Sequence, residues 1–477
     1  MKITELKNKK IAILGYWMEG KSTERFLKKL NIKNYKILDK SLDSNYLSNL
    51  ENFDVIFKSP WISPYNNPEL LKVSEKLTSQ AEILADNFDW KIIWITGTKG
   101  KSTTSTLLYE ILKELWYKVK LVWNIWNSVF DEVNLISPLL DKRGAGGEFS
   151  CENYDYLVYE LSSYMLEWLE LNIFVWLLNN IYDCHLDWHN WRENYENAKF
   201  NIFKNAEYKL VSSELENVVG NECIRSLQGL DFFGLDWEYS YKNNAFYIWE
   251  EEILKDENIA LNWEHNRKNI SGIIWILDKI WIFKDSPIIP FSSKGDEHNS
   301  IEKIKKVLSE FSWLAHRQEN IWIYRWITFI NDSIASTPES AIAAIKTFWE
   351  KISTVFIWNE DSGFDLTELR KTIKEYKIPN IVLFPTTWEK LFWEFSKDMK
   401  FDEISKFTDW DFKTKLLKTL SMEEAVKFAY NNSEVWQIVL LSTWAPSFNA
   451  NWPWIMPWKS FVEKWELFKK FVEKYSK

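Results

Sequence analysis

A glycine-rich stretch at residues 96–103 has the residue types and spacing of a phosphate-binding loop. Its sequence is TGTKGKST, and Lys101 and Ser102 directly follow the second glycine. Glycines let backbone N–H groups approach phosphate oxygens, and a helix N-terminus adds positive potential. The lysine can reach the terminal phosphates and the serine can hold Mg²⁺. The first glycine of the common motif is absent, so this loop is a variant, and an ordinary surface loop is the alternative.

Acidic and histidine side chains follow two other apolar runs. Glu160 ends one run, before Ser162 and Ser163, and His185 follows the next. Ligands bind at the carboxyl ends of strands in open α/β sheets, so these side chains are candidates for Mg²⁺ coordination, although histidine is a less usual ligand. A core histidine and a zinc site around CHLDWH (184–189) are the alternatives; alternate residues of an extended chain point in opposite directions, which disfavours zinc.

Repeated strand–loop–helix patterns would position these residues. KKIAILGYWMEGKSTERFLKKL (9–30) predicts a strand, a tight turn and a helix, and further strands are predicted at 35–41 and 54–64. A second α/β unit begins near residue 89 and a third near residue 313. Strands that alternate with helices indicate parallel sheets. The fold class is therefore α/β, with an N-terminal Rossmann-like, a central ATPase-like and a C-terminal Rossmann-like part, and domains expected at residues 1–88, 89–312 and 313–477.

Composition restricts the class of protein. The chain has 477 residues, a net charge of −9 and three cysteines. A net negative charge disfavours a broad nucleic-acid surface, and three cysteines do not make a disulfide framework. The first ten residues lack the apolar region of a signal peptide, and no apolar run is long enough to cross a membrane. We expect a cytoplasmic monomer that binds small molecules and neither nucleic acid nor membrane.

The numbers of glycine and tryptophan are abnormal. The chain has 13 Gly and 30 Trp, whereas ordinary usage predicts roughly 33 glycines for this length. The turn from Gly15 to Gly20 has the form G-x-W-x-x-G, which becomes a dinucleotide-type fingerprint if Trp17 stands for glycine. A protein merely rich in aromatic residues is one interpretation; replacement of one residue type by the other is the second.

Taken together, the motifs resemble the Mur ligases, a family of ATP-dependent amide-forming enzymes of peptidoglycan synthesis. The resemblance covers nearly the whole chain and is strongest to the members that add D-glutamate to UDP-N-acetylmuramoyl-L-alanine. The matching segments occur in the order of the family: TGTKGKSTT, NIWNS, ELSSYMLE, YDCHLDWH, YENAKFNIF, EHNRKN, AHRQE, NDSIASTPESAIAAI and LSTWAPSF, followed by FVEKWELFKKFV.

The resemblance implies a role for individual residues. ATP would bind through Gly97, Thr98, Lys99, Gly100, Lys101, Ser102 and Thr103, with Asn266 and Asn269 near adenine and Arg317 and Asp332 from the third domain. Two Mg²⁺ ions would be held by Ser102, Glu160, His185 and a carbamylated Lys199, and catalysis would rest on Lys101, Glu160, His185 and Lys199. The two substrates would contact Gly15, Trp17, Asp39, Ser59, Asn124, Ser162, Ser447 and Phe461.

The resemblance also suggests an explanation for the tryptophans. Trp17, Trp61, Trp94, Trp123, Trp126, Trp263, Trp322, Trp326, Trp444 and Trp465 stand at glycine positions of the family pattern, whereas Trp188 stands where the family accepts tryptophan. Glycine supplies positive φ and close backbone approach, which tryptophan cannot. We hypothesise that the gene uses UGA for glycine and that this sequence renders UGA as tryptophan. Position 94, at the mouth of the phosphate loop, is expected to need glycine for a tight turn.

Two departures from the family leave the acceptor amino acid open. Ile334 and Ser362 stand where some members carry lysine. Another amide ligase of the superfamily, such as folylpolyglutamate synthase, is therefore one alternative. A non-catalytic nucleotide-binding homologue is the other, if the tryptophans are genuine.

Overall fold

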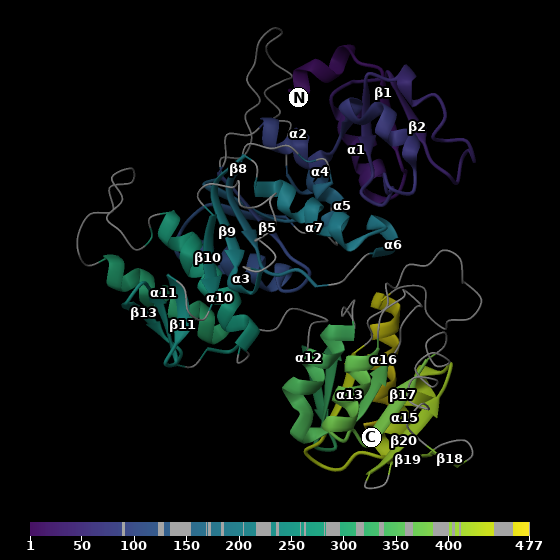
Figure 1. Ribbon diagram of the computed structural model, residues 1–477, viewed down its shortest axis with the longest axis vertical. Helices are drawn as coiled ribbons and strands as arrows, with labels where there is room; N and C mark the ends of the chain where they lie inside the picture. The colour runs from purple at the N-terminus through teal and green to yellow at the C-terminus, as the bar shows by residue number, and fades with distance from the viewer. Residues whose placement is uncertain are drawn as a thin grey trace. The chain divides into compact units, whose positions relative to one another are not determined.

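The chain forms two compact units, residues 1–311 and 312–477 (Figure 1). The structure is a computed structural model that describes residues 1–87, 91–122, 128–133, 154–167, 169, 173–182, 186–203, 205–215, 230–234, 238–257, 259–261, 264–280, 282, 296–311, 319–332, 338–357, 366–384, 400–402, 406–409, 412–442 and 461–476. Within these residues, no helix combines the length and the apolar character that crossing a membrane requires.

The first sheet is small and wholly parallel, with the strand order β2-β1-β3-β4. Its strands are β1 (Ile11–Leu14), β2 (Tyr35–Leu38), β3 (Val55–Lys58) and β4 (Leu77–Thr78), and its helices are α1 (Met18–Lys29) and α2 (Gln80–Asn87). All four residues of β1 are buried, as expected for a parallel strand covered on both faces. The predicted strands and helix of this region are confirmed.

The central sheet belongs to the same compact unit and has the order β13-β12-β11-β10-β9-β8-β5-β7-β6. Neighbouring strands from β6 to β11 pair in parallel, and β12 and β13 add an antiparallel edge. The strands are β5 (Lys91–Thr96), β6 (Val119–Val122), β7 (Tyr156–Glu160), β8 (Ile173–Leu178), β9 (Ala206–Ser212), β10 (Leu230–Gly234), β11 (Tyr239–Lys242), β12 (Ala245–Ile248) and β13 (Glu251–Lys255).

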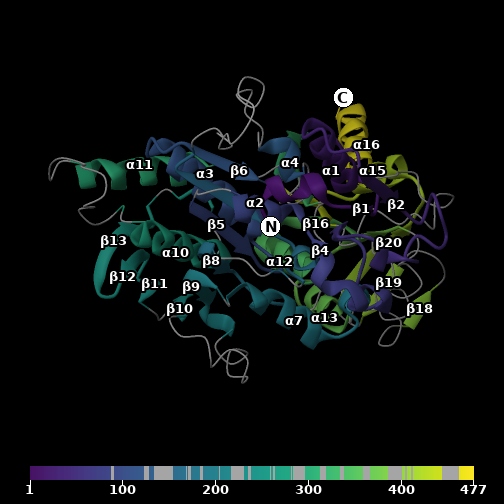
Figure 2. The same ribbon diagram turned by 90° about the horizontal axis from the view of Figure 1, so that it is seen from above.

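Seven α-helices among the described residues belong to this part of the chain, and α3, α4, α7, α10 and α11 are labelled in Figure 2. They are α3 (Lys101–Glu114), α4 (Val129–Glu132), α5 (Ser163–Leu166), α6 (Leu186–His189), α7 (Arg192–Phe200), α10 (Glu264–Lys279) and α11 (Asp296–Glu310). The strand–loop–helix pattern predicted at residues 92–113 is confirmed as β5 and α3. The antiparallel edge was not predicted from the sequence.

The second unit contains a mixed sheet of order β14-β15-β21-β16-β17-β20-β19-β18, parallel in its centre and antiparallel at both edges. Its strands are β14 (Glu319–Tyr324), β15 (Ile327–Asp332), β16 (Ile352–Ile357), β17 (Asn380–Leu383), β18 (Lys400–Asp402), β19 (Lys406–Asp409), β20 (Phe412–Lys418) and β21 (Ile438–Ser442). Its helices are α12 (Pro338–Phe348), α13 (Thr367–Glu375), α15 (Met422–Asn431) and α16 (Phe461–Tyr475).

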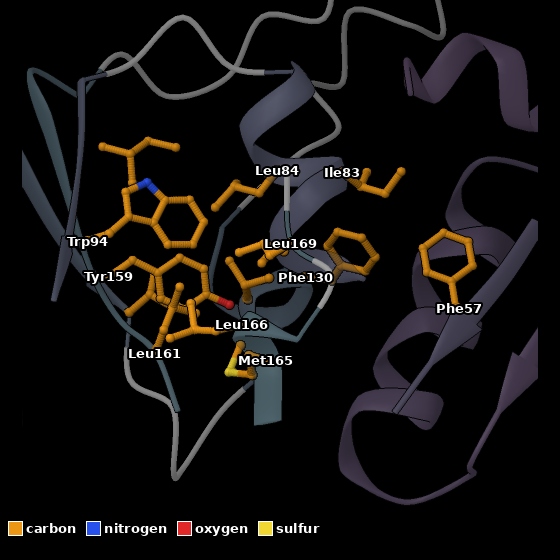
Figure 3. Packing of buried hydrophobic residues seen from close by; sticks show 14 of the residues in the cluster. Phe57, Ile83, Leu84, Trp94, Phe130, Tyr159, Leu161, Met165, Leu166 and Leu169 are labelled. Carbon is orange, nitrogen blue, oxygen red and sulfur yellow. The ribbon is translucent and has the colours of Figure 1, made fainter. Parts of the chain in front are cut away.

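One hydrophobic cluster joins the first sheet to the central sheet (Figure 3). Phe130 stacks on Phe26 with ring centroids 4.0 Å apart and meets Phe57 of β3 at 6.3 Å. On the central sheet, Trp94 lies 5.0 Å from the ring of Tyr159. Since these contacts are closely packed and apolar, they fix the first sheet against the central one.

The expectation that Trp94 occupies a tight turn was wrong. Trp94 lies inside β5, three residues before Gly97, and its side chain is fully buried in the cluster of Figure 3. Its neighbours across the sheet are aromatic, with Trp176 centred 5.1 Å away. The indole nitrogen has no hydrogen-bond partner among the described residues, and such a buried donor costs about 1–3 kcal/mol.

Other tryptophans do occupy backbone conformations that favour glycine. Trp116, Trp249, Trp326 and Trp436 have φ angles of 71°, 56°, 62° and 70°. Trp116 follows the C-cap of α3; its N–H donates to Lys113 O at 3.0 Å and the N–H of Tyr117 donates to Leu112 O at 3.1 Å. This pattern is the Schellman motif, whose left-handed residue is usually glycine. For a bulky residue, positive φ is a genuine outlier.

Candidate active site

The loop between β5 and α3 requires glycine at two positions. Gly100 is the N-cap of α3 with φ +77°, and a Cβ there would lie 3.0 Å from the amide atoms of Asn179 and Asn269. A Cβ on Gly97 would lie 2.9 Å from the Cβ of Asn179. Because a Cβ has no room at either position, both residues must be glycine, and the loop leads directly into a helix N-terminus, the kind of place where proteins bind phosphate oxygens.

Residues after β8 hold this loop in place. The N–H of Thr98 donates to the carbonyl of Asn180 at 3.0 Å, and the N–H of Lys99 donates to the Asn180 side chain at 2.7 Å. The hydroxyl of Thr98 is 2.6 Å from the hydroxyl of Tyr195 on α7. Asn180 and Tyr195 were not predicted as site residues. An Asn-Asn pair after a strand is typical of any loop, and a tyrosine on a helix carries no signal for a contact with a distant loop.

The first residues of α3 carry the polar groups that the sequence predicted. The ammonium of Lys101 lies across the loop and donates to Gly97 O at 2.9 Å and Thr98 O at 3.1 Å. Ser102 is 1% exposed, and Thr103 follows it in the same turn, half-buried. The lysine therefore stands beside the backbone that would surround a phosphate.

Glu160 and Lys199 come from different elements and lie at the same end of the central sheet. Glu160 ends β7 with no exposed surface, and neither carboxylate oxygen has a hydrogen-bond partner among the described residues. Lys199, on α7, is 1% exposed and donates to the hydroxyl of Thr96 at 3.4 Å. That hydroxyl donates to the carbonyl of Leu161, the residue after Glu160, at 2.9 Å.

A buried carboxylate without a protein partner suits a divalent cation, because burying an unpaired charge is otherwise costly. Carboxylate and hydroxyl oxygens are the ligands that Mg²⁺ prefers. Glu160 and Ser102 therefore fit Mg²⁺. His185, the third predicted ligand, lies outside the described residues, and no group of three His, Cys, Asp or Glu side chains suited to a metal was found among the residues described.

His189 is a buried residue beside Lys199 that the sequence placed only in a possible zinc pattern. It has no exposed surface, and its Nε2 is 3.1 Å from the hydroxyl of Ser163. Its Nδ1 is 3.9 Å from Glu167 Oε2. Burial, and next the charge of Lys199, lower the pKa of His189 to about 3, so the ring is neutral at pH 7.

The predicted substrate residues of the first sheet lie at the carboxyl ends of its strands. Gly15 follows β1 with φ +90°, Asp39 follows β2 and Ser59 follows β3. Asp39 accepts hydrogen bonds from the N–H of Tyr16 at 2.6 Å and of Ser41 at 2.8 Å. Burial alone raises the pKa of Asp39, but the hydrogen bonds from Ser41 and Tyr16 hold it below its ordinary value. This edge of the sheet is the usual ligand-binding edge.

Tryptophans occupy the turn at this edge. Trp17 is the N-cap of α1 and is 47% exposed; Trp61 is 56% exposed. Their ring centroids are 6.2 Å apart. Two partly exposed tryptophan rings thus lie near each other in the segments that follow β1 and β3, where the resemblance puts the diphosphate of the substrate.

The remaining predicted residues lie on several elements of both units. Ser162 is the N-cap of α5, and Asn266 and Asn269 are buried on the first turns of α10, with Asn269 beside Gly100. In the second unit, Asp332 ends β15 and accepts a hydrogen bond from the hydroxyl of Ser442 at 3.0 Å. Phe461 is the first residue of α16. Asn124, Arg317 and Ser447 lie outside the described residues.

Known proteins are similar to this chain over nearly its whole length. Residues 95–270 match the Mur ligase middle domain. A UDP-N-acetylmuramoylalanine–D-glutamate ligase from Acetivibrio thermocellus is 28% identical, covering 98% of this chain and 97% of that protein. An enzyme of the same name from Clostridium tetani is 27% identical over 98% and 96% of the two chains.

Solved structures share the fold. A UDP-N-acetylmuramate–alanine ligase from Thermotoga maritima superposes with a TM-score of 0.55 at 16% identity, covering 98% of this chain and 99% of the other. The MurF ligase of the same organism, in complex with ADP, gives 0.54 at 14% identity over 99% and 96%. At these identities the likeness concerns the fold.

Proposed function

We propose that this member of the Mur ligase family is the ATP-dependent ligase that joins D-glutamate to UDP-N-acetylmuramoyl-L-alanine in peptidoglycan precursor synthesis. One observation carries the proposal: relatives named for this reaction match almost the whole chain. The phosphate loop, Glu160 and Lys199, which lie at one end of the central sheet, support it. The protein would act in the cytoplasm, as a monomer, through domains at residues 1–88, 89–312 and 313–477.

The chemistry consists of a phosphoryl transfer followed by amide formation. The γ-phosphate of ATP passes to the carboxylate of the UDP-muramoyl-alanine substrate and gives an acyl phosphate. The amine of D-glutamate attacks the acyl carbon, loses a proton and expels phosphate. Such a transfer depends on positioning and charge neutralisation more than on covalent participation by the protein.

The residues of the loop would orient ATP. Backbone N–H groups at the start of α3 would face its phosphates, since those of Thr98 and Lys99 already donate to Asn180. Lys101 would exchange its two carbonyl partners for phosphate oxygens. Asn269 stands beside Gly100 and would limit how far the nucleotide enters. We propose, from the resemblance, that Arg317 and Asp332 contribute to nucleotide binding and that Ser447 and Phe461 contribute to binding of the acceptor.

Ser102, Glu160, His185 and Lys199 would hold two Mg²⁺ ions. When bound, these ions neutralise charge that develops on the transferred phosphoryl group. We propose that Lys199 is carbamylated: its ammonium loses one proton, the neutral amine then adds carbon dioxide and releases a second proton, and a buried cation becomes an anion. The hydroxyl of Thr96 would orient this group, since it already contacts the Lys199 amine.

The experiment that tests this function is a phosphate-release assay with candidate acceptors. It uses the full chain as written and a second form with Trp17→Gly, Trp61→Gly, Trp123→Gly, Trp126→Gly and Trp444→Gly. D-glutamate is expected to be the best acceptor with UDP-N-acetylmuramoyl-L-alanine. Equal or faster turnover with L-glutamate, lysine or diaminopimelate would reject the assignment, and preferred turnover of a folate would favour the folylpolyglutamate synthase alternative. Nucleotide binding without turnover in both forms would favour the non-catalytic homologue.

A further inference from the structure

We propose that residues 58–67, called here the 58–67 segment, position the bound UDP-substrate against the metal-holding residues, with Tyr65 and Ser63 as the positioning side chains. This inference rests on the proposed function. The segment leaves β3 and ends before the helical turn that begins at Pro68. It is assigned by resemblance only to the substrate diphosphate, through Ser59.

Two hydrogen bonds tie this segment to the central part of the same unit. The hydroxyl of Ser63 donates to the carbonyl of Trp188 at 2.5 Å, in a buried position. The hydroxyl of Tyr65 donates to the carboxylate of Glu167 at 2.9 Å. Trp188 lies on α6 and Glu167 directly follows α5. The segment is thus bonded to α6 and to the residue after α5, the short helix that follows β7 and its last residue Glu160.

Aromatic and cationic contacts reinforce these bonds. The ammonium of Lys58 donates to Ser59 O and Ile62 O, each at 3.2 Å, and lies 5.7 Å from the ring centre of Trp188. Trp188 packs at 4.9 Å on Tyr164 of α5. Because Lys58 bonds the backbone of the segment and also faces Trp188, it keeps the segment folded onto α6.

The bond from Tyr65 leads towards Lys199. The other oxygen of Glu167 is 3.9 Å from Nδ1 of His189, and both atoms are buried without a hydrogen-bond partner among the described residues. The ring of His189 is centred 5.2 Å from that of Tyr195, and the Lys199 ammonium lies 5.0 Å from the centre of the same Tyr195 ring. The hydrogen bond from Tyr65 therefore leads to a buried pair of polar groups near Lys199, and losing a bond to a buried polar group is costlier than losing an apolar contact.

The opposite side of the segment is fixed to the substrate turn. A Cβ on Gly15 would lie 2.7 Å from the Cβ of Ser59 and 3.2 Å from Cδ1 of Ile62. The segment therefore packs directly on the turn after β1 and cannot shift without it. A substrate held by Gly15 and Ser59 is placed relative to Glu160 and Lys199 through Ser63 and Tyr65.

This geometry predicts an effect on the chemical step rather than on binding. A small misplacement of reacting groups can decrease turnover as much as a hundred-fold. Tyr65→Phe removes one hydroxyl and leaves the ring in place. We expect kcat to fall roughly ten- to hundred-fold, while the Kd of ATP and the Kd of the UDP-substrate change less than about three-fold. Ser63→Ala should give a smaller effect of the same kind.

The matched control is Tyr35→Phe. The Tyr35 hydroxyl also donates to a carboxylate, Glu24 at 3.0 Å, and that bond stays within the first sheet and its helix. Both variants are compared in whichever form of the full chain turns over, using phosphate release, ATP titration and thermal unfolding. Tyr35→Phe should lower the melting temperature as much as Tyr65→Phe but leave kcat unchanged.

The outcomes separate the two proposals. An unchanged kcat in Tyr65→Phe, or equal decreases of kcat in Tyr65→Phe and Tyr35→Phe, would overturn the positioning role. A collapse of ATP affinity in Tyr65→Phe would also overturn it, because that result indicates a general loss of structure. Turnover with an acceptor other than D-glutamate would reject the proposed function, yet Tyr65→Phe would still be scored with that acceptor. The absence of turnover with every acceptor would reject both.

Discussion

Replacing Trp249 with glycine should stabilise the protein. Trp249 opens the two-residue turn between β12 and β13, has φ 56° and is 67% exposed. Hairpin turns with positive φ at this position favour glycine. The left-handed conformation costs a non-glycine residue about 1–2 kcal/mol, and the greater freedom of glycine in the unfolded chain offsets about 0.5–1 kcal/mol of that gain. The expected net gain in the free energy of unfolding is about 0.5–1 kcal/mol, since the exposed ring buries little surface.

The matched control is Trp249→Ala, which removes the same indole but keeps a Cβ in the strained conformation. Urea unfolding of the full chain, followed by circular dichroism, would compare the three proteins. Glycine should be more stable than tryptophan, and alanine should show no gain from relief of backbone strain. Equal stability of the glycine and alanine variants would refute the argument from φ.

The same reasoning bears on the genetic code of the source organism. If UGA encodes glycine there, the natural protein carries glycine at positions 116, 249, 326 and 436, where tryptophan has positive φ. Mass spectrometry of peptides that cover these positions, from the natural protein, distinguishes the two residues directly. Tryptophan at all four positions would reject the hypothesis, as would UGG codons in the gene.

Three further predictions follow from the site and from the second unit. Mg²⁺ should raise the melting temperature of the unaltered chain but not of Glu160→Gln, because the buried carboxylate of Glu160 is the expected ligand; an equal shift in both would exclude Glu160 as a ligand. Tyr195→Phe, which removes the 2.6 Å contact with Thr98, should weaken ATP binding roughly five-fold, or about 1 kcal/mol, and an unchanged Kd in calorimetry would contradict a role for that contact. Burial lowers the pKa of Lys464 to about 7 although Asp332 opposes this; between pH 7 and 10 the unfolded chain keeps the proton that the folded chain has lost. The stability of the unaltered chain relative to Lys464→Met should therefore rise with pH, by up to roughly 1.4 kcal/mol per unit, and urea unfolding that shows a flat or falling difference would refute it.

Much of the fold could be predicted because its signals are local. The stretch from Ile92 to Leu112 contains an apolar strand, a glycine-rich loop and a helical pattern in sequence, and the structure has β5, the loop and α3 in that order. The antiparallel edges were missed in part because their strands are short. The turn between β12 and β13 carries Trp249, and the turn between β14 and β15 carries Trp326, where hairpins usually have glycine. Without glycine or asparagine in these two turns, the usual hairpin signal is absent from them. The turn between β11 and β12 does carry Asn243 and Asn244, and that signal was overlooked.

The site was predictable where a motif fixes the spacing, and less so where contacts are long-range. Lys101 and Ser102 follow from the loop itself. The hydrogen bonds of Asn180 to Thr98 and Lys99, and of Tyr65 to Glu167, join residues about 80 to 100 positions apart, and no local pattern predicts such pairs. At Trp94 a local pattern gave a wrong prediction. Because glycine was expected at this position, the residue was assigned to a turn, whereas it lies inside β5.

The two carbonyl contacts of Lys101 have a consequence for turnover. Under the proposed function, with the ammonium already bonded to Gly97 and Thr98, the contribution of Lys101 to nucleotide affinity would be the difference between two sets of hydrogen bonds rather than the strength of one. The lysine would gain only the energy by which its hydrogen bonds to phosphate exceed its hydrogen bonds to the carbonyls, and this would moderate the affinity for the product. When the product departs, the Lys101 ammonium would bond again to the carbonyls of Gly97 and Thr98 and would not be left without hydrogen-bond acceptors. The loop could therefore release its nucleotide without an anion from solution to neutralise the Lys101 charge.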